Sequence, residues 1–152
     1  LAGLSLGQVC HVVQLAISQK RILGYVDGSI VPHNLSEEAV KEQCAVWMRP
    51  FNCPLKQQEA GQCPVANWDE ARACLSAILR SAHRPSVGNG GAVAISNIKR
   101  LFRSRFGLDL SETSLGYSRL SELLQDARLR DICVVHCRGA GQFVAGVQAP
   151  SP

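Results

Sequence analysis

The N-terminal half of the chain carries apolar residues at helical spacing in three places. The first predicts a helix from about residue 6 to residue 23, before Gly24, with its apolar positions at Val9, Val12, Val13, Ala16 and Ile17. Asp27-Gly28 predicts a turn after it. Ser36 precedes two acidic residues and predicts the start of a second helix, because a serine hydroxyl and acidic side chains both favour a helix N-terminus.

The second helix ends before Pro50 and places Val40, Cys44 and Trp47 on one face. Residues 49–66 contain three prolines and predict a long loop. A third helix begins at Asn67 or Asp69, and its apolar stripe consists of Ala71, Cys74, Leu75, Ile78 and Leu79. We expect the aromatic residues of this half to anchor the core; they are Trp47, Phe51 and Trp68.

The C-terminal half predicts a different arrangement. Residues 94–106 form a helix with Ile95, Ile98, Phe102 and Phe106 on a shared arc, and Gly107 ends it as a C-terminal cap. Ser111 begins a very short helix that runs to Leu115, and Gly116 makes a tight turn. Ser118 caps the next helix, which holds Leu120, Leu123 and Leu124. Two helices joined by a short glycine-containing turn are typical of a helix-turn-helix.

Two β-rich runs follow, Ile132–Cys137 and Gln142–Val147, around a glycine-rich loop. This pattern predicts a hairpin, and three helices followed by a hairpin describe a winged helix. The fold class is therefore mainly α with a small β-hairpin. Residues 83–91 are rich in glycine and proline, so we expect a helical accessory region at 1–82, a linker at 83–91 and a winged-helix domain at 92–148.

Charge separates the same two halves. Residues 1–82 carry seven basic and seven acidic side chains, whereas residues 83–152 carry nine basic and five acidic ones, so the net charge of +4 lies in the second half. This asymmetry indicates a polyanionic partner. No window approaches the roughly 18 apolar residues of a membrane span, and we expect no membrane partner. The chain begins at Leu1 rather than a methionine, so we expect it to be part of a longer protein.

The candidate binding residues are basic. Lys99, Arg100 and Arg103 fall within an arc of about 100° opposite the apolar arc of their helix. Arg119 opens the recognition helix and Arg138 lies at the wing tip, where a winged helix meets a nucleic-acid backbone. Tyr117 either packs beneath the recognition helix or stacks on a base. The alternative for the basic cluster is a solvated helix face.

Catalytic and metal-binding signals are weak in this chain. The seven cysteines include no CxxC pair, the spacing that structural zinc sites commonly use. On a strand, Cys133 and Cys137 would share one face and His136 would take the other, so the three side chains would not converge on a metal ion. We therefore expect small buried side chains rather than zinc ligands, with no cofactor. The sequence contains no phosphate-binding loop, no HExxH motif and no carboxylate cluster of the kind that metal-dependent nucleases need, so we expect no enzyme.

A family resemblance sharpens this interpretation. Ile98-Lys-Arg-Leu-Phe-Arg-Ser-Arg-Phe-Gly-Leu-Asp-Leu110, the core Leu115-Gly-Tyr-Ser-Arg-Leu-Ser-Glu-Leu-Leu124 and the run Ile132–Cys137 resemble a LOTUS (OST-HTH) domain over about residues 95–147. The resemblance implies a winged helix of germ-granule and RNA-regulatory proteins. Minimal members of the family bind RNA, including G-rich and G-quadruplex RNA, and extended members use an extra C-terminal helix to bind DEAD-box helicases. The chain ends at Gln148-Ala-Pro-Ser-Pro152, which leaves no room for that helix, so the resemblance favours RNA binding.

The sequence therefore predicts a non-catalytic, cytoplasmic module, including in ribonucleoprotein granules, that binds G-rich or structured RNA. The alternative is a protein-interaction module that docks a DEAD-box helicase or another ribonucleoprotein component. A third candidate, duplex DNA binding, offers only Arg119, Glu122 and Gln125 to read base edges, which are too few to support it.

Overall fold

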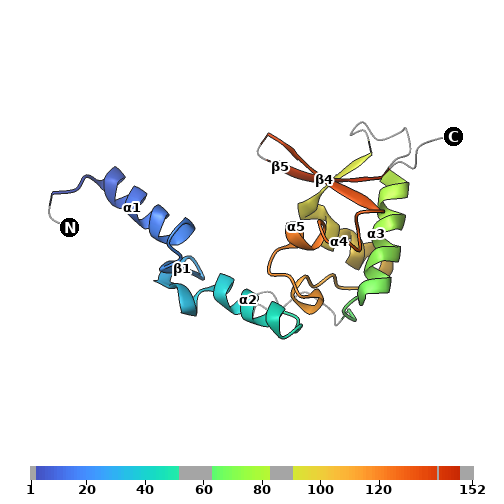
Figure 1. The fold of residues 1–152 in the computed structure, drawn as a ribbon, viewed down its shortest axis with the longest axis horizontal. Helices are drawn as coiled ribbons and strands as arrows, with labels where there is room; N and C mark the ends of the chain where they lie inside the picture. Colours follow the sequence, from blue (N-terminus) through green and yellow to red (C-terminus); the bar gives the residue numbers. More distant parts are fainter. Residues whose placement is uncertain (1–2, 52–62, 83–90, 140, 148–152) are drawn as a thin grey trace.

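The protein has an extended N-terminal arm joined to a rounded body (Figure 1). The computed structural model describes residues 3–51, 63–82, 91–139 and 141–147. We call residues 3–51 the arm and residues 63–147 the body. The arm holds α1 (Leu6–Ser18), β1 (Leu23–Val26), β2 (Ser29–Pro32), a short 3-10 turn η1 (His33–Leu35) and α2 (Glu37–Val46). The body holds α3 (Trp68–Ala82), β3 (Ala92–Ala94), α4 (Ile95–Phe106), a 3-10 turn η3 (Thr113–Leu115), α5 (Leu120–Leu123), β4 (Cys133–Arg138) and β5 (Gly141–Gly146).

The first helix is shorter than its apolar pattern predicts. α1 begins at a capping box between Ser5 and Gln8 and ends at Ser18, so the prediction that it reaches residue 23 is wrong. Gln19 is the C-cap, Arg21 has a left-handed φ of 51°, and Leu23 already belongs to β1. Asp27 and Gly28 both have positive φ, as the tightest hairpin turns require, and β1 pairs antiparallel with β2 around them.

The second helix begins where the sequence predicts. Ser36 caps α2 by accepting a hydrogen bond from the Ala39 amide at 3.2 Å. Its predicted core face is not buried, however, because α2 lies outside the body. Trp47 is exposed beside Arg49, whose guanidinium carbon is 5.7 Å from the centroid of the indole ring, so the expectation that Trp47 anchors the core is wrong.

The hydrophobic core belongs to the body. α3 contributes its whole predicted stripe, and α4 contributes Ile95, Ile98 and Phe102. Val144 of β5 belongs to the same cluster. So do six residues that follow α4 in the chain: Leu110, Leu115, Leu123, Leu124, Leu129 and Cys133. The predicted division therefore separates elements that share one core, because α3 precedes residue 83 and packs with α4 and β5.

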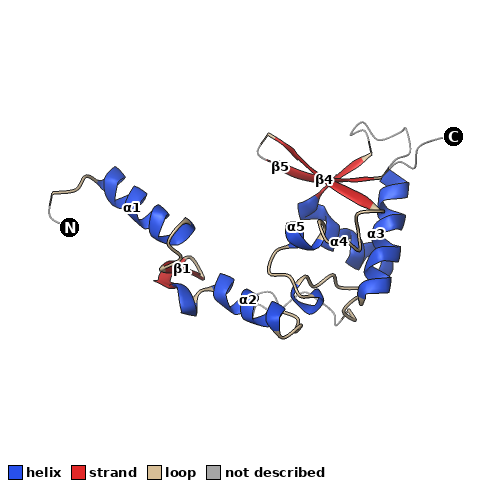
Figure 2. Ribbon diagram, in the orientation of Figure 1, coloured by secondary structure: helices blue, strands red, loops and turns tan. Residues whose placement is uncertain are grey.

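The sheet of the body has three strands rather than the two of a hairpin. β5 pairs antiparallel with β4 on one side and with β3 on the other, in the order β3-β5-β4. Figure 2 shows this small sheet in red against the helices of the body. The predicted helix start at residue 94 is one residue early, because Ala94 is the last residue of β3 and the N-cap of α4.

The helix-turn-helix is built as its glycines predict. Gly107 ends α4 with a φ of 62° and Gly116 follows η3 with a φ of 90°, both in the left-handed region that glycine adopts without strain. Ser111 accepts a hydrogen bond from the Ser114 amide at 3.4 Å. Ser118 does not cap the next helix, because its hydroxyl donates to Glu122 and the N-cap of α5 is Arg119. The central parts of the predicted loop and linker, 52–62 and 83–90, lie outside the described residues.

Candidate nucleic-acid interface

The basic side of α4 points away from the core. Ile98 and Phe102 are fully buried, so the opposite arc of the helix faces solvent. Arg100 lies on this arc, is exposed and makes no ion pair with any residue that the structure describes. Its guanidinium is therefore available to a phosphate group in solution.

The two neighbouring cations of α4 have partners in the loop after the helix. Lys99 pairs with Glu112, whose side chain is only 9% exposed. Arg103 donates from Nε to Asp109 Oδ1 at 2.9 Å, and its Nη2 atom also lies 2.9 Å from that oxygen. Both cations keep a substantial part of their side chains exposed, so they still face solvent beside Arg100. The three predicted residues of α4 thus share one surface, with two of them held in place.

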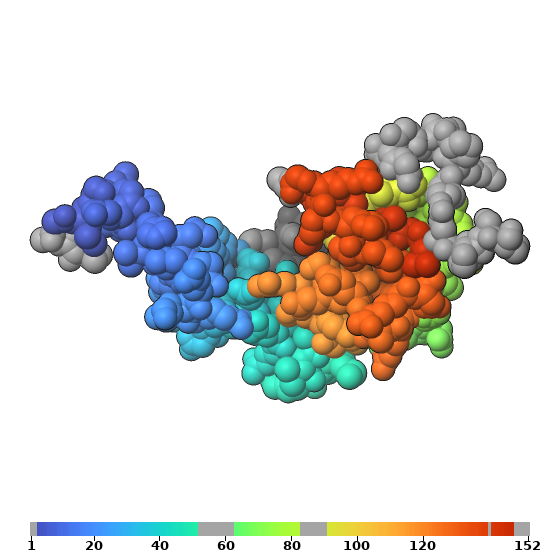
Figure 3. Space-filling model, turned by 45° about the horizontal axis from the view of Figure 1, so that its top comes forward, coloured from blue at the N-terminus to red at the C-terminus, as the bar shows by residue number. Residues whose placement is uncertain are grey.

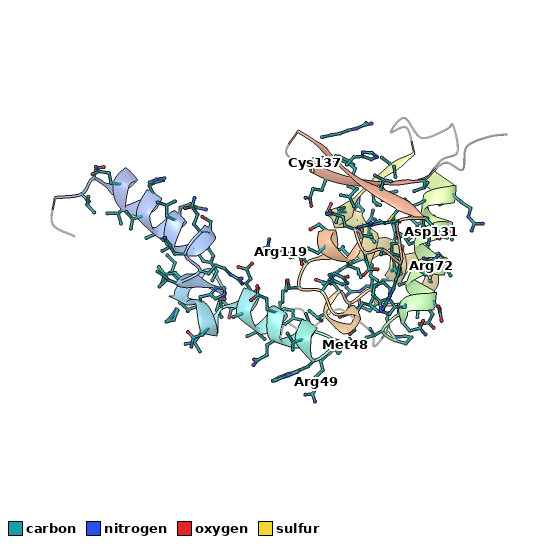
Figure 4. All side chains as sticks on the ribbon, viewed as in Figure 1. Met48, Arg49, Arg72, Arg119, Asp131 and Cys137 are labelled. Atoms are coloured by element: carbon teal, nitrogen blue, oxygen red, sulfur yellow. The ribbon has the colours of Figure 1, made fainter. Side chains whose placement is uncertain are left out.

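Arg119 connects the body with the arm. It is the N-cap of α5 and forms an ion pair with Glu38 of α2, 81 residues earlier in the chain. The hydrogen bond from Arg119 is the main cause that lowers the pKa of Glu38, and the same bond raises the pKa of Arg119. Figure 4 shows Arg119 on the side of the body that faces the arm. The guanidinium of the predicted recognition helix is therefore already bound to a carboxylate.

Arg138 ends β4 at the tip of the wing. It pairs in register with Gly141 of β5, is exposed and makes no ion pair within the described ranges. Gly139, next to it, has a φ of 58° and begins the turn between the two strands. The structure therefore places Arg138 at the wing tip, with no ion-pair partner among the described residues.

Tyr117 is held by contacts with other residues of the body. Its hydroxyl donates a hydrogen bond to Asp126, and its ring meets the edge of Trp68 at a centroid distance of 6.5 Å and an angle of 81°. This hydrogen bond is the main cause that raises the pKa of Tyr117 and lowers that of Asp126. Of the two roles that the sequence leaves open for Tyr117, these contacts favour packing against the core.

Sequence reasoning did not find two further arginines that make specific contacts. Arg128 lies over the Trp68 ring, 4.5 Å from its centroid, and its backbone N–H donates to Asp126 at 2.6 Å. Arg72 of α3 holds Asp131 with two parallel hydrogen bonds of 3.0 and 2.7 Å, and the two residues lie side by side in Figure 4. Arg72 lies 59 residues from Asp131 and Arg128 lies 60 residues from Trp68, so no local pattern signals these contacts.

The described cysteines lie in different environments. Cys74 and Cys133 are buried in the core, where burial raises the pKa of Cys133 to about 11, whereas Cys10 and Cys137 are exposed. Cys133 and Cys137, both in β4, therefore lie in different environments. Among the described residues, no three His, Cys, Asp or Glu side chains gather closely enough to hold a metal ion. None of the described helices is long and apolar enough to cross a bilayer.

Comparison with known proteins gives one match. The family model of the OST-HTH/LOTUS domain matches residues 69–145. This match confirms the resemblance and extends it toward the N-terminus to include α3, in agreement with the shared core of α3, α4 and β5. No curated protein and no solved structure matches the chain.

Proposed function

Because this chain belongs to the OST-HTH/LOTUS domain family, we propose that it binds G-rich or structured RNA, of the G-quadruplex type, through the basic surface of its body. Domains of this family are non-catalytic modules that bind RNA or proteins in germline RNA regulation. The proposed surface combines the α4 cations with Arg119 and the wing cation Arg138. We also propose that the protein acts in the cytoplasm, in ribonucleoprotein granules, where such RNA is regulated.

The distribution of charge carries this proposal. Residues 69–145 hold eleven of the sixteen basic side chains but seven of the twelve acidic ones, so the whole net charge of +4 falls within the matched domain. Residues 1–68 are neutral. A domain with this excess attracts a polyanion over a distance of about a Debye length, roughly 8 Å at physiological ionic strength.

The surface suits phosphate contacts better than base reading. Arg100 and Arg138 have no acidic partner among the described residues, so binding a phosphate costs them no existing ion pair. Lys99 and Arg103 would contact a phosphate with the N–H groups that their carboxylate partners, Glu112 and Asp109, leave unused. Contacts of this kind give affinity that falls with salt and depends little on base identity. Selectivity for G-rich RNA would then come from the shape of the folded RNA.

Binding of three labelled ligands at two salt concentrations tests the proposal. The ligands are a G-quadruplex-forming RNA, an unstructured RNA of equal length and a DNA duplex of equal charge. We expect the G-rich RNA to bind most tightly and its affinity to fall steeply with salt. Arg100→Glu with Arg138→Glu should lower the affinity for all RNAs by about tenfold or more and flatten the salt dependence, because two phosphate contacts are replaced by repulsion.

Arg80→Glu is the matched control for this experiment. It makes the same charge change on α3, outside the proposed surface, where the Arg80 guanidinium is bound to the Ser76 hydroxyl. If Arg80→Glu lowers the RNA affinity as much as Arg100→Glu or Arg138→Glu does alone, only the net charge of the domain matters. That result would overturn the assignment of the surface. Weak, equal binding to all three ligands would overturn RNA binding itself.

A protein-interaction role is the second candidate, and the exposed arm favours it. Several large apolar side chains of the arm face solvent, with Leu6 81% and Val46 78% exposed. Apolar surface of this extent on an extended segment is typical of a segment that docks another protein, such as a DEAD-box helicase. The two candidates use different parts of the molecule, so binding of RNA to the body and of a protein to the arm can be measured separately.

A further inference from the structure

The arm brings an acidic helix to the helix-turn-helix of the body. α2 carries Glu37, Glu38 and Glu42 against a single Lys41, which gives it a net charge of −2. It lies beside η3, the 3-10 turn that leads into the glycine turn and α5. In Figure 3 the cyan surface of α2 adjoins the orange surface of this region. A negative helix therefore borders the part of the body that should meet a negative ligand.

Two contacts fix this position. The Phe51 backbone N–H, just after α2, donates to Thr113 Oγ1 of η3 at 2.8 Å. Glu38 forms its ion pair with Arg119, which immediately precedes α5. The cation at the start of the predicted recognition helix is thus satisfied by the arm rather than left for a ligand.

A carboxylate and a phosphate group make the same kind of contact with a guanidinium, so they compete for it. On the proposed function above, we infer that α2 is an autoinhibitory element, in which Glu38 occupies Arg119 and must leave before RNA can bind there. Arg119 is paired with a carboxylate, whereas Arg100 and Arg138 have no such partner among the described residues. RNA therefore first meets a basic surface in which Arg119 is paired with Glu38, and displacement of α2 adds Arg119 to the binding surface.

The contact between α2 and the body is weak enough to be released. Ala45 is the only buried residue of α2, and α1 buries none, so little apolar surface holds the arm to the body. The side chains of Arg119 and Glu38 are 63% and 36% exposed, so water and salt reach their ion pair. Exposed ion pairs are weak and screened by salt, which suits a switch better than a permanent clamp. Two other charged side chains of α2 are bound within the arm, because Glu42 pairs with Arg21 and Lys41 lies over the Phe51 ring.

Replacement of Glu38 tests the inference in the full chain. Glu38→Gln should raise the affinity for the G-rich RNA about two- to fivefold at low salt, the range set by one exposed ion pair. Glu37→Gln is the matched control, since it removes the same charge from the same turn of α2 and Glu37 makes no ion pair with a described residue. The gain for Glu38→Gln should exceed that for Glu37→Gln and shrink at high salt.

A double variant shows whether the gain acts through Arg119. In the Arg119→Gln background, Glu38→Gln should give no gain in RNA affinity, because the cation that Glu38 pairs with is then absent. If RNA binds and depends on Arg100 and Arg138, yet Glu38→Gln matches Glu37→Gln, the autoinhibition is overturned and the proposed function stands. If no variant binds RNA in a salt-dependent way, the proposed function is overturned and the inference with it. Equal melting temperatures for the variants establish that the fold is unchanged.

Discussion

Neighbours decide what each polar side chain of this surface does. Lys99, Arg103 and Arg119 look alike in the sequence, but each has a different carboxylate partner, from the loop after α4 or from the arm. Tyr117 donates its hydroxyl proton to Asp126, so its aromatic ring is fixed at the edge of Trp68. A side chain held in this way contributes to stability before it contributes to binding.

Tyr117→Phe tests this assignment. The variant keeps the ring and removes the hydrogen bond to a charged acceptor, so we expect a loss of about 1 kcal/mol in the free energy of unfolding at pH 7. We expect RNA affinity to stay unchanged. Tyr25→Phe, at an exposed tyrosine of the arm, is the control and should change neither quantity. A large loss of RNA affinity with unchanged stability would assign Tyr117 to binding instead.

The pH dependence of the same pair has a defined sign. The hydrogen bond from Tyr117 lowers the pKa of Asp126 from its ordinary value of 3.8, so its stabilisation is present above pH 3.8 and is lost as the pH falls through the lowered value. The pKa of Tyr117 is raised from 10.0, so its contribution is present below pH 10.0 and is lost above the raised value. The stability difference between the native chain and Tyr117→Phe should therefore shrink at both extremes, as denaturant titrations across the pH range would show.

At the scale of elements, the hairpin of the arm is tied to α2 by a close approach. A Cβ atom at Gly24 of β1 would lie 2.3 Å from the Cβ of Ser36, which is buried. Ser36 caps α2 and also donates its hydroxyl proton to the His33 carbonyl at 2.6 Å. The hairpin and the start of α2 therefore form one packed unit, although neither belongs to the core of the body.

Gly24→Ala should loosen this unit alone. The added methyl group cannot fit without moving the α2 cap, so we expect altered backbone NMR shifts and lower amide protection from residue 23 to residue 46. Residues of α4 should keep their protection, because the core of the body does not include the hairpin. Gly7→Ala in α1 meets open space and should leave the hairpin unchanged, while stabilising α1 slightly. Loss of protection in α4 on Gly24→Ala would show that arm and body unfold together.

At the scale of the whole molecule, stability is uneven. The body buries a continuous core around Phe102, where truncation to alanine would cost about 3–5 kcal/mol, whereas α1 has no buried residue. The capping box and the apolar residues of α1 favour the helix, but short isolated helices are only marginally stable in water. The arm is therefore the part of the chain that opens most easily.

Hydrogen exchange measured by mass spectrometry should show this gradient. We expect the amides of α1 to exchange fastest among the described helices of the arm and body, and those of α3 and α4 slowest. A DEAD-box helicase domain that docks on the arm should slow exchange in α1, whereas G-rich RNA should slow it on α4 and the wing instead. Protection of α1 equal to that of α4 in the isolated chain would contradict the exposed position of α1.

Local signals in the sequence determined a large part of this protein. The apolar stripes of α3 and α4, the left-handed glycines at 107 and 116, the hairpin of β4 and β5, and the family resemblance all follow from neighbouring residues, because helix periodicity and turn geometry are local. The basic face of α4 and the wing cation follow from the same periodicity. The arm was harder to predict, since the apolar positions of α1 continue past the residue where the helix ends.

Only the tertiary structure decided which distant groups meet. β3 has three residues, too few to show a strand pattern, and exists because β5 supplies its hydrogen bonds. The pairing of Arg119 with Glu38 joins residues 81 positions apart, and the exposure of Trp47 follows from the place of α2 outside the core. Such contacts depend on how the chain folds back on itself. The sequence by itself thus determined the helices and the hairpin of the body and its positive charge. The tertiary structure decided how these elements share one core and which of the charges are free to bind.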